Sequence, residues 1–365
     1  MYVAAHNGAH VWGGAERGVA WILAGLQERG HRVRLFCNDR LVAEGARALG
    51  VPAEILPLGG DVAVHHAVRC AWALRRDPPN ALIVGTFRKL WLAAFAGRLA
   101  GVRTIARIGL ETDIPRNAKY RWILTHWVDT VVLKADDVRA AYLRALPGLD
   151  PARLITVPGG VERPRRRRAP GSVRAELGIP EEARVIGSLG RLAEQKRFDR
   201  LLHAVALLPH DVRCIVAGEG SEHVALRELA AELGITERVH LVGHRDDVGD
   251  VLAALDVFVV SSDREMLSFA MLEALAAGVP VVSTPVSGAA NALAAARKGI
   301  APGVVVGFDP AEIAAAVFRL LSDPERLREM GEAARRRAGE HYGREAMLDG
   351  WEAVLNGVAE PSPAA

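Results

Sequence analysis

Two cations in the second half of the chain, Arg191 and Lys196, have the types and the spacing needed to bind an anionic group. They lie in "GSLGRLAEQKRFD", where a short apolar run ends at Gly190 and a helix-like segment follows. Arginine can fork onto two phosphate oxygens, whereas lysine acts as a point charge. The segment therefore predicts a diphosphate clamp at the end of a strand, although two solvated loop cations would show the same spacing.

Two glutamates, Glu265 and Glu273, stand eight positions apart in the otherwise apolar stretch "SSDREMLSFAMLEALAAGVPVVS". A carboxylate near a core costs free energy unless it is paired, hydrogen-bonded or kept for a ligand. Eight helical residues span about 12 Å, so we expect the two acids to grip different parts of one extended ligand. The alternative is that Glu265 caps a helix and Glu273 pairs with an arginine.

The backbone between the two acids is a further candidate for anion binding. A helix that begins near residue 267 or 268 would place the N–H groups of Leu267, Ser268 and Phe269 at the positive end of its dipole. Such N–H groups bind phosphate oxygens.

A glycine-rich turn, "GGAER", contains Gly13 and Gly14 and follows the first strand-like run. Paired glycines let a backbone approach a ligand closely, but they also make ordinary strand-to-helix turns. The turn lacks the third glycine of the dinucleotide fingerprint, although Asp39 after the second strand keeps a nicotinamide-dependent oxidoreductase open as an alternative. Two later turns, "AGEGSE" and "GHRDDV", are candidates for contacts with a nucleotide.

These candidate residues are spread over strands and helices that alternate along the whole chain, which is typical of parallel α/β construction. Strand-like runs in the first half occupy residues 2–5, 32–36, 53–56, 81–85, 103–107, 130–133 and 154–157. Those in the second half occupy residues 185–189, 213–217, 239–242, 257–261, 279–283 and 304–306. Open α/β sheets bind ligands at the carboxyl ends of their strands, so a cleft between two doubly wound domains is the expected site.

The segment "PGGVERPRRRRAPGS" interrupts this alternation with proline, glycine and arginine, and it predicts a solvated linker. We expect a first Rossmann-like domain at 1–162, a linker at 163–174 and a second Rossmann-like domain at 175–342. The last helix and the tail, 343–365, are expected to cross back to the first domain.

The composition, with 50% hydrophobic and 24% charged residues, fits a globular protein. Three scattered cysteines are typical of reduced thiols in a cytoplasmic compartment. The N-terminal residues do not have the pattern of a signal peptide, and no run reaches the roughly 18 apolar residues of a membrane span.

The net charge of +3 conceals an asymmetry between the two halves. Residues 1–170 hold 26 Lys and Arg against 14 Asp and Glu, which gives +12, and residues 171–365 hold 20 against 29, which gives −9. This asymmetry predicts that the first half meets an anionic partner such as a membrane surface, unless arginine is simply abundant in this chain. Nucleic acid is not expected, because the cations are not interleaved with aromatic residues.

Together, and in this order, these motifs resemble the family-4 retaining glycosyltransferases (glycosyl transferases group 1), which have the GT-B fold. The family's Gly-Gly-x-Glu loop is matched by Gly13, Gly14 and Glu16, and its Gly-Arg…Lys clamp by Arg191 and Lys196 after Gly190. Its two-glutamate motif is matched by Glu265 and Glu273, followed by "LEALAAGVPVVST". The resemblance is densest over residues 185–290.

The resemblance implies a role for each matched residue. Arg191 and Lys196 would neutralise the diphosphate of a nucleotide-sugar donor as it leaves, and the amides of Met266–Phe269 would hold the same oxygens. Glu265 would bind hydroxyls of the donor sugar and Glu273 those of the ribose. The clamp would replace a divalent metal, so neither a metal nor another cofactor is expected, and the leaving phosphate would serve as the base.

Three positions depart from the family pattern. Asn291 stands where an acid is common after the Ser-Gly turn. Met266 stands where the family usually has glycine, which narrows the space beside the sugar and bears on donor choice. Arg107 occupies about the place of a histidine found in many members, so it and His10, in the first loop with His6, are candidates for acceptor or phosphate contacts.

The resulting prediction is a metal-independent, retaining hexosyl- or related glycosyltransferase with two Rossmann-like domains that face each other across a cleft. It would move a sugar from a nucleotide-diphosphate donor, bound by the second domain, to a lipid-linked or cell-envelope glycan, bound by the first. We expect the enzyme in the cytoplasm, in peripheral contact with an anionic membrane and acting in polysaccharide or lipopolysaccharide biosynthesis. The alternative is a non-catalytic nucleotide-sugar-binding protein of the same fold.

Overall fold

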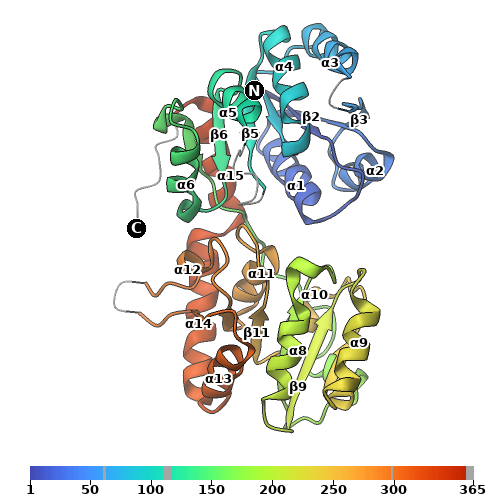
Figure 1. The fold of residues 1–365 in the computed structure, drawn as a ribbon, viewed down its shortest axis with the longest axis vertical. Helices are drawn as coiled ribbons and strands as arrows, with labels where there is room; N and C mark the ends of the chain where they lie inside the picture. Colours follow the sequence, from blue (N-terminus) through green and yellow to red (C-terminus); the bar gives the residue numbers. More distant parts are fainter. Residues whose placement is uncertain (61–62, 110–116, 297–298, 359–365) are drawn as a thin grey trace. The chain divides into compact units, whose positions relative to one another are not determined.

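The computed structural model describes residues 1–60, 63–109, 117–296 and 299–358. The chain divides into two compact units, Met1–Gly159 with Glu345–Ala365, and Gly160–Arg344. Each unit is a parallel sheet covered by helices, so the doubly wound α/β construction predicted from the alternation of apolar runs is confirmed (Figure 1).

The first unit contains a seven-stranded parallel sheet with the order β3-β2-β1-β4-β5-β6-β7. Its strands are β1 (Tyr2–Asn7), β2 (Arg32–Cys37), β3 (Ala53–Ile55), β4 (Ala81–Val84), β5 (Arg103–Arg107), β6 (Thr130–Leu133) and β7 (Leu154–Thr156). The helices are α1 (Gly14–Glu28), α2 (Arg40–Ala48), α3 (Val64–Arg76), α4 (Leu90–Ala100), α5 (Ala118–His126), α6 (Arg139–Ala145) and α15 (Arg344–Asn356). Strands β1, β4 and β6 are buried along their whole length, as expected of central strands covered on both faces.

The last helix, α15, packs into the core of this first unit although it comes at the end of the chain (Figure 1). Trp351 is 2% exposed among side chains of β1 and α1, and Leu348 lies where a Cβ on Gly25 would be 2.7 Å from its methyl groups. Arg29 at the end of α1 binds Glu345 and Glu352, with nitrogen–oxygen distances of 2.6 and 2.7 Å. Apolar packing and ion pairs therefore both hold α15 on α1.

The second unit contains a six-stranded parallel sheet with the order β10-β9-β8-β11-β12-β13. Its strands are β8 (Arg184–Leu189), β9 (Val212–Ala217), β10 (Val239–Leu241), β11 (Val257–Val260), β12 (Val281–Ser283) and β13 (Gly303–Val305). The helices are α7 (Ser172–Glu176), α8 (Phe198–Ala206), α9 (His223–Glu232), α10 (Val248–Ala253), α11 (Phe269–Ala277), α12 (Ala289–Ala292), α13 (Pro310–Leu321) and α14 (Pro324–His341).

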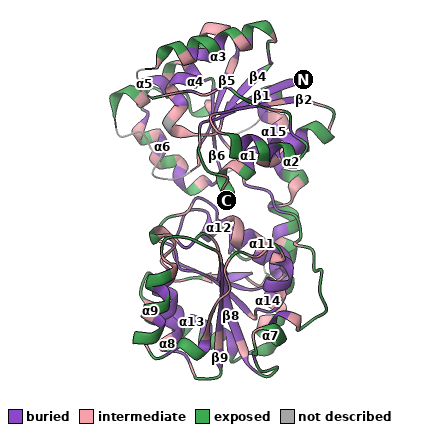
Figure 2. Ribbon diagram, turned by 90° about the vertical axis from the view of Figure 1, so that its right-hand side faces the viewer, coloured by how far each residue is buried: buried purple, intermediate pink, exposed green. Residues whose placement is uncertain are grey.

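Two hydrophobic clusters cover the opposite faces of this second sheet, whose strands are largely buried (Figure 2). Side chains of α8, α9 and α13 form one cluster, and side chains of α7, α10, α11 and α14 form the other. Helices on both faces leave the carboxyl ends of the strands as the place where loops can gather polar groups.

Residues 163–174, expected to be a solvated linker, belong instead to the second unit. The backbone N–H groups of Arg167 and Arg168 donate to the carboxylate of Asp250, which is 5% exposed, at 3.0 and 3.1 Å. A Cβ on Gly249 would collide with the Arg165 carbonyl oxygen. The arginine side chains remain exposed, but their backbone is fixed to α10, so this segment is not a free hinge.

The described residues contain no helix that is both long enough and apolar enough to cross a membrane. Cys37, Cys70 and Cys214 are unpaired and buried.

Candidate functional site

The carboxyl ends of β8 and β11, which are neighbours in the second sheet, border a small hollow. Side chains from both strand ends and from the loops that follow them line it: Ser188, Leu189, Lys196, Phe198, Phe258, Val260, Ser262, Glu265 and Ser268. Doubly wound sheets bind ligands at this edge, and the hollow holds both charged groups singled out by the sequence, a lysine and a glutamate.

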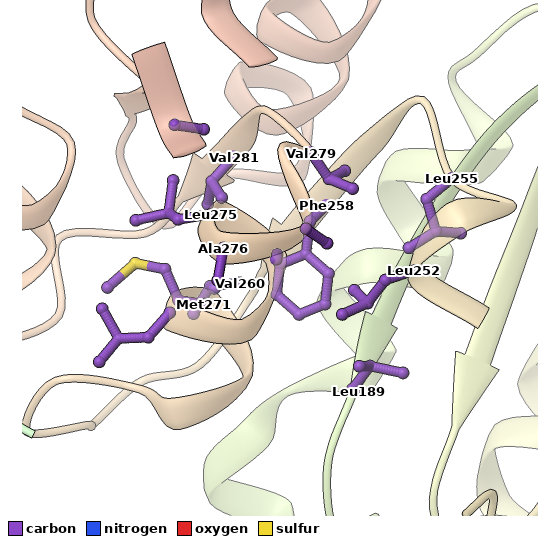
Figure 3. Close-up of a cluster of buried hydrophobic side chains, with 14 of the residues drawn as sticks. Leu189, Leu252, Leu255, Phe258, Val260, Met271, Leu275, Ala276, Val279 and Val281 are labelled. Atoms are coloured by element: carbon purple, nitrogen blue, oxygen red, sulfur yellow. The ribbon is translucent and has the colours of Figure 1, made fainter. Parts of the chain in front are cut away.

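Three apolar residues that line this hollow also belong to the hydrophobic core drawn in Figure 3. Leu189, Phe258 and Val260 belong to the same buried cluster as Met271 and Leu275 of α11. Close packing fixes the strand ends and the start of the helix, so the loops above them have a rigid base.

The Lys196 ammonium contacts the carboxylate of Glu265 in an ion pair. The two side chains are only 18% and 12% exposed, and Ser262 donates its hydroxyl to the same carboxylate oxygen at 3.2 Å. Because the pair is largely shielded from water, salt screens it less than a surface pair. The sequence predicted separate ligand groups for the two residues, and the structure brings the side chains into direct contact.

The loops that carry Lys196 and Glu265 are braced against each other by Arg200, a residue that the sequence analysis missed. Its guanidinium is 7% exposed and donates to the Ser261 carbonyl oxygen at 2.5 Å and to the Asp263 carboxylate at 2.6 Å. Ser261 in turn donates its hydroxyl to the Lys196 carbonyl oxygen at 3.0 Å. The charges of "KRFDR" and "SSDRE" were the only available signal, and they did not reveal that the two segments meet.

Arg191, the second cation of the predicted clamp, has an exposed side chain for which the described residues offer no hydrogen bond or ion pair. It follows Gly190, whose φ of +147° is rarely adopted by other residues. The geometry leaves the Arg191 guanidinium accessible to a ligand while Lys196 is already paired.

The glycines of "AGEGSE" serve the packing of two loops rather than an opening for a ligand. A Cβ on Gly218 would collide with the Gly190 carbonyl oxygen, and one on Gly220 with the Leu192 carbonyl oxygen. The Leu192 N–H also donates to the Glu219 carbonyl oxygen at 2.8 Å. In "GHRDDV", Arg245 pairs with Glu176 and Asp247, which is a structural role.

Helix α11 begins at Phe269 with Ser268 as its N-cap, one to two residues later than the predicted start at 267 or 268. The first helix bond runs from the Leu272 N–H to the Ser268 carbonyl oxygen at 3.1 Å, so the ladder does not use the amides of the first turn. The Leu267 N–H, in contrast, donates to the Ser287 carbonyl oxygen at 2.9 Å. It is therefore not available to a phosphate, which removes Leu267 from the predicted anion-binding amides.

Met266 and Leu267 turn into the protein just before this helix. They are 2% and 3% exposed, and Met266 forms a parallel bridge with Ser287. Leu267 has a φ of +54°, a conformation that leucine rarely adopts. The Met266 side chain thus fills space inside the unit.

Glu273 lies in the second turn of α11 and is partly buried. Because the helix begins four residues after Glu265, the 12 Å separation expected from eight helical residues does not apply here.

In the first unit, Arg107 ends β5 as a buried cation. Its side chain is 4% exposed, and the described residues provide no hydrogen-bond partner for its Nη1. Burial lowers the pKa of Arg107 to about 10, against the opposing effect of the Glu16 carboxylate. The remainder of the segment that follows, residues 110–116, lies outside the described residues.

The glycine turn lies near Arg107, because the carboxylate of Glu16 in this turn interacts electrostatically with the Arg107 guanidinium. The Gly13 N–H donates to the Glu16 carboxylate at 3.1 Å, which closes the first turn of α1. A Cβ on Gly14 would meet no atom within 4 Å, so Gly14 faces open space. Neither glycine has a positive φ, so the turn geometry does not require them.

Two histidines near this turn differ in environment. His10 is exposed and its Nδ1 is 3.6 Å from Asp39, which caps α2 by accepting from the Leu41 N–H. His6 was expected in the first loop, and this is wrong: it lies in β1, is fully buried, and its Nε2 is 3.1 Å from the Leu56 carbonyl oxygen. Burial lowers the pKa of His6 to about 4. Asp39, the residue on which the nicotinamide alternative rested, is engaged as a helix cap.

Comparison with known proteins matches residues 172–337 to the family model described as glycosyl transferases group 1. The lipopolysaccharide core biosynthesis glycosyltransferase LpsE of Rhizobium meliloti is 36% identical over 183 residues, which cover 50% of this chain and 52% of LpsE. A D-inositol 3-phosphate glycosyltransferase of Streptomyces bingchenggensis is 30% identical over 334 residues, which cover 82% of this chain and 70% of that protein. The chain thus spans about half the length of LpsE and more of the second relative.

Among solved structures, HepE of Anabaena in complex with UDP superimposes with a TM-score of 0.85 at 18% identity. The alignment covers 98% of this chain and 100% of HepE. At this identity the likeness establishes the fold.

Proposed function

The chain belongs to the glycosyl transferases group 1 family, and we propose that it transfers a sugar from a nucleotide-diphosphate donor to a glycan acceptor. The observation that carries this proposal is the group of charges at the ends of β8 and β11: exposed Arg191, and Lys196 paired with Glu265. HepE, which shares the fold, was solved with UDP and with UDP-glucose, so UDP-sugars are the first donors to try.

The chemical role proposed for Arg191 and Lys196 is to neutralise the diphosphate as the bond to the sugar breaks. Negative charge grows on the leaving oxygen in the transition state, and fixed cations that face it lower the barrier. The first-turn amides of α11 would add dipoles directed at the same oxygens. On this proposal two cations do what a divalent metal does elsewhere, so turnover should persist in a chelator.

Glu265 is proposed to bind hydroxyls of the donor sugar and Glu273 those of the ribose. Arrival of the diphosphate would give Lys196 a second anionic partner, which would release part of Glu265 for the sugar. Retention of anomeric configuration follows if the acceptor attacks the face from which the diphosphate leaves, with the leaving phosphate as base. NMR assignment of the new linkage distinguishes this outcome from inversion.

The acceptor is proposed to be a lipid-linked or cell-envelope glycan that binds the first unit, with His10 and Arg107 as candidate contacts. The name of LpsE and the excess of cations in the first half of the chain both support this proposal. It also implies peripheral contact with an anionic membrane at its cytoplasmic face.

The proposal is tested by a thermal-shift screen of the whole chain against UDP-, GDP- and ADP-sugars, repeated with Arg191→Ala and Glu273→Ala. Arg227→Ala on exposed α9 is the matched control, because it removes a cation from the same unit away from the hollow. We expect one donor class to stabilise the wild type and the control but not the two variants. No shift with any donor, or an unchanged shift in both variants, would overturn the donor site.

The alternative, a nucleotide-sugar-binding protein without turnover, rests on two departures from the family pattern, methionine at position 266 and arginine instead of histidine at about position 107. Tight binding of a donor that stays intact through long incubation with a broad acceptor mixture would support that alternative and contradict transfer.

A further inference from the structure

Helix α3 of the first unit has an apolar row on its exposed side. Its inner face, formed by Ala67, Cys70, Ala71 and Leu74, is buried, and the helix packs on α4. Val64, Val68 and Trp72 face the other way and are 43%, 50% and 64% exposed. Residues four apart lie above one another on a helix, so these three form one continuous row, here named the α3 row. Figure 2 shows exposed positions along α3.

The core of the first unit does not explain the α3 row. An amphipathic helix at a protein surface keeps one apolar face for the core and polar residues elsewhere. Single exposed apolar side chains are ordinary, but a contiguous apolar row edged by polar groups marks an interaction surface. A tryptophan with most of its surface in water is the largest member of the row.

Arginines flank the α3 row on the same helix. Arg69 and Arg76 are exposed beside it, and the helix itself, Val64–Arg76, contains no Asp or Glu. The Arg76 guanidinium lies 5.5 Å from the Trp72 ring centroid, in a cation–π arrangement. Residues 64–126 as a sequence hold 11 Lys and Arg against 3 Asp and Glu. The net charge of this segment is +8, which is two thirds of the +12 of residues 1–170.

Helix α5, which contacts α4, repeats the combination of tryptophan and cations. Trp122 is 49% exposed, and its neighbours Lys119 and Arg121 are exposed. Tryptophan is enriched at the boundary between lipid chains and water, and basic helices with an apolar face lie in the plane of that boundary.

We propose that the α3 row, with Trp72 as its anchor, inserts into the interfacial layer of a bilayer rich in anionic lipid. The surrounding arginines would contact lipid phosphates while the row enters the upper acyl region. Charge complementarity favours this occupant over a protein, because a narrow apolar row edged by cations on a strongly basic segment matches a negatively charged lipid surface. The inference deepens the membrane contact proposed above by assigning it to one helix, and it rests on that part of the proposed function.

The test is co-sedimentation of the full chain with vesicles of phosphatidylcholine and of 70:30 phosphatidylcholine:phosphatidylglycerol, at low and high salt. The wild type should bind the anionic vesicles, bind the neutral ones at least about tenfold more weakly, and lose affinity as salt rises. The triple variant Val64→Ser/Val68→Ser/Trp72→Ser should lose about tenfold or more in partitioning to anionic vesicles. Arg69→Gln/Arg76→Gln should weaken the binding and flatten its salt dependence.

Controls separate this inference from misfolding and from the donor site. Leu41→Ser on α2 and Val224→Ser on α9 remove side chains that are 58% and 64% exposed elsewhere, and both variants should bind vesicles like the wild type. The triple variant should keep the wild-type unfolding temperature and its donor-induced thermal shift. Unchanged vesicle binding in the triple variant, or equal binding to neutral vesicles, would overturn the inference while leaving sugar transfer intact. A wild-type dimer that Trp72→Ser dissociates would overturn it in favour of self-association.

Discussion

Lys196 and Glu265, 69 positions apart in sequence, form an ion pair where β8 and β11 end side by side. Each carries a charge that the proposed reaction uses, and each neutralises the other before a donor arrives. The pair holds a cation and a carboxylate together at the place where the proposed reaction would bring a diphosphate and a sugar.

Substitution of either partner should separate binding from turnover. Glu265→Gln leaves Lys196 without its counter-charge, so we expect UDP to bind at least as tightly as it does to the wild type. The rate of sugar transfer should fall by about tenfold or more. Lys196→Ala should weaken UDP binding and lower kcat by about 10²–10³-fold. Calorimetry with UDP and initial-rate assays measure the two effects, with Arg227→Ala as control. Weaker UDP binding in Glu265→Gln would show that the carboxylate helps to bind the diphosphate rather than to occupy Lys196.

Arg200 is predicted to position the loop that carries Glu265 without touching the donor. Arg200→Met removes its bonds to Ser261 and Asp263, and we expect kcat to fall roughly 10- to 100-fold because the carboxylate is displaced. Arg200→Lys can keep only one of the two bonds and should recover part of the activity. Rates and donor KM should be measured for both variants at equal folded fraction. Equal loss in the two variants would indicate a general folding defect instead of positioning.

The sequence predicted the strands and the loop between β11 and α11 well because their signals are local. β-branched and apolar runs mark the buried strands in both halves of the chain. Ser268 before an apolar run marks the start of α11 within one or two residues. The family motifs then located Arg191, Lys196 and Glu265. Each of these signals is contained in fewer than about fifteen consecutive residues.

The features that the sequence did not predict depend on contacts between distant segments. The Lys196–Glu265 pair and the Arg200 brace form only because β8 and β11 are adjacent in the sheet. Residues 163–174 have the composition of a linker, yet their amides bind the buried Asp250 of α10. His6 was expected in a loop because the first predicted strand ended at residue 5, whereas β1 continues to Asn7. Tertiary structure overrides local composition at all of these places.

We predict that Arg107 contributes to acceptor binding but does not stabilise the fold. A buried guanidinium with an unpartnered Nη1 contributes little, and replacing such a charge by an apolar side chain is often neutral or stabilising. Arg107→Met should therefore keep or raise the unfolding temperature, whereas the acceptor KM should rise roughly tenfold or more and the donor KM should not change. Steady-state kinetics with each substrate varied in turn measures the effect. A clear loss of stability with unchanged acceptor KM would assign Arg107 to the core alone.

His6 should make the first unit lose stability in acid. Burial lowers its pKa from 6.5 to about 4, so above about pH 6.5 it is neutral in both the folded and the unfolded chain. As pH falls below 6.5 the unfolded chain takes up a proton that the folded chain refuses, and stability declines until about pH 4, by roughly 3 kcal/mol in total. Urea unfolding of the wild type and His6→Gln between pH 7.5 and 4 measures this, because glutamine does not titrate and can still donate to the Leu56 carbonyl oxygen. The variant should lose less stability than the wild type over that range, and the exposed-site control His10→Gln should follow the wild type. Parallel pH profiles for the wild type and His6→Gln would show that His6 is protonated inside the fold without penalty, which would contradict the assignment of its burial as the cause.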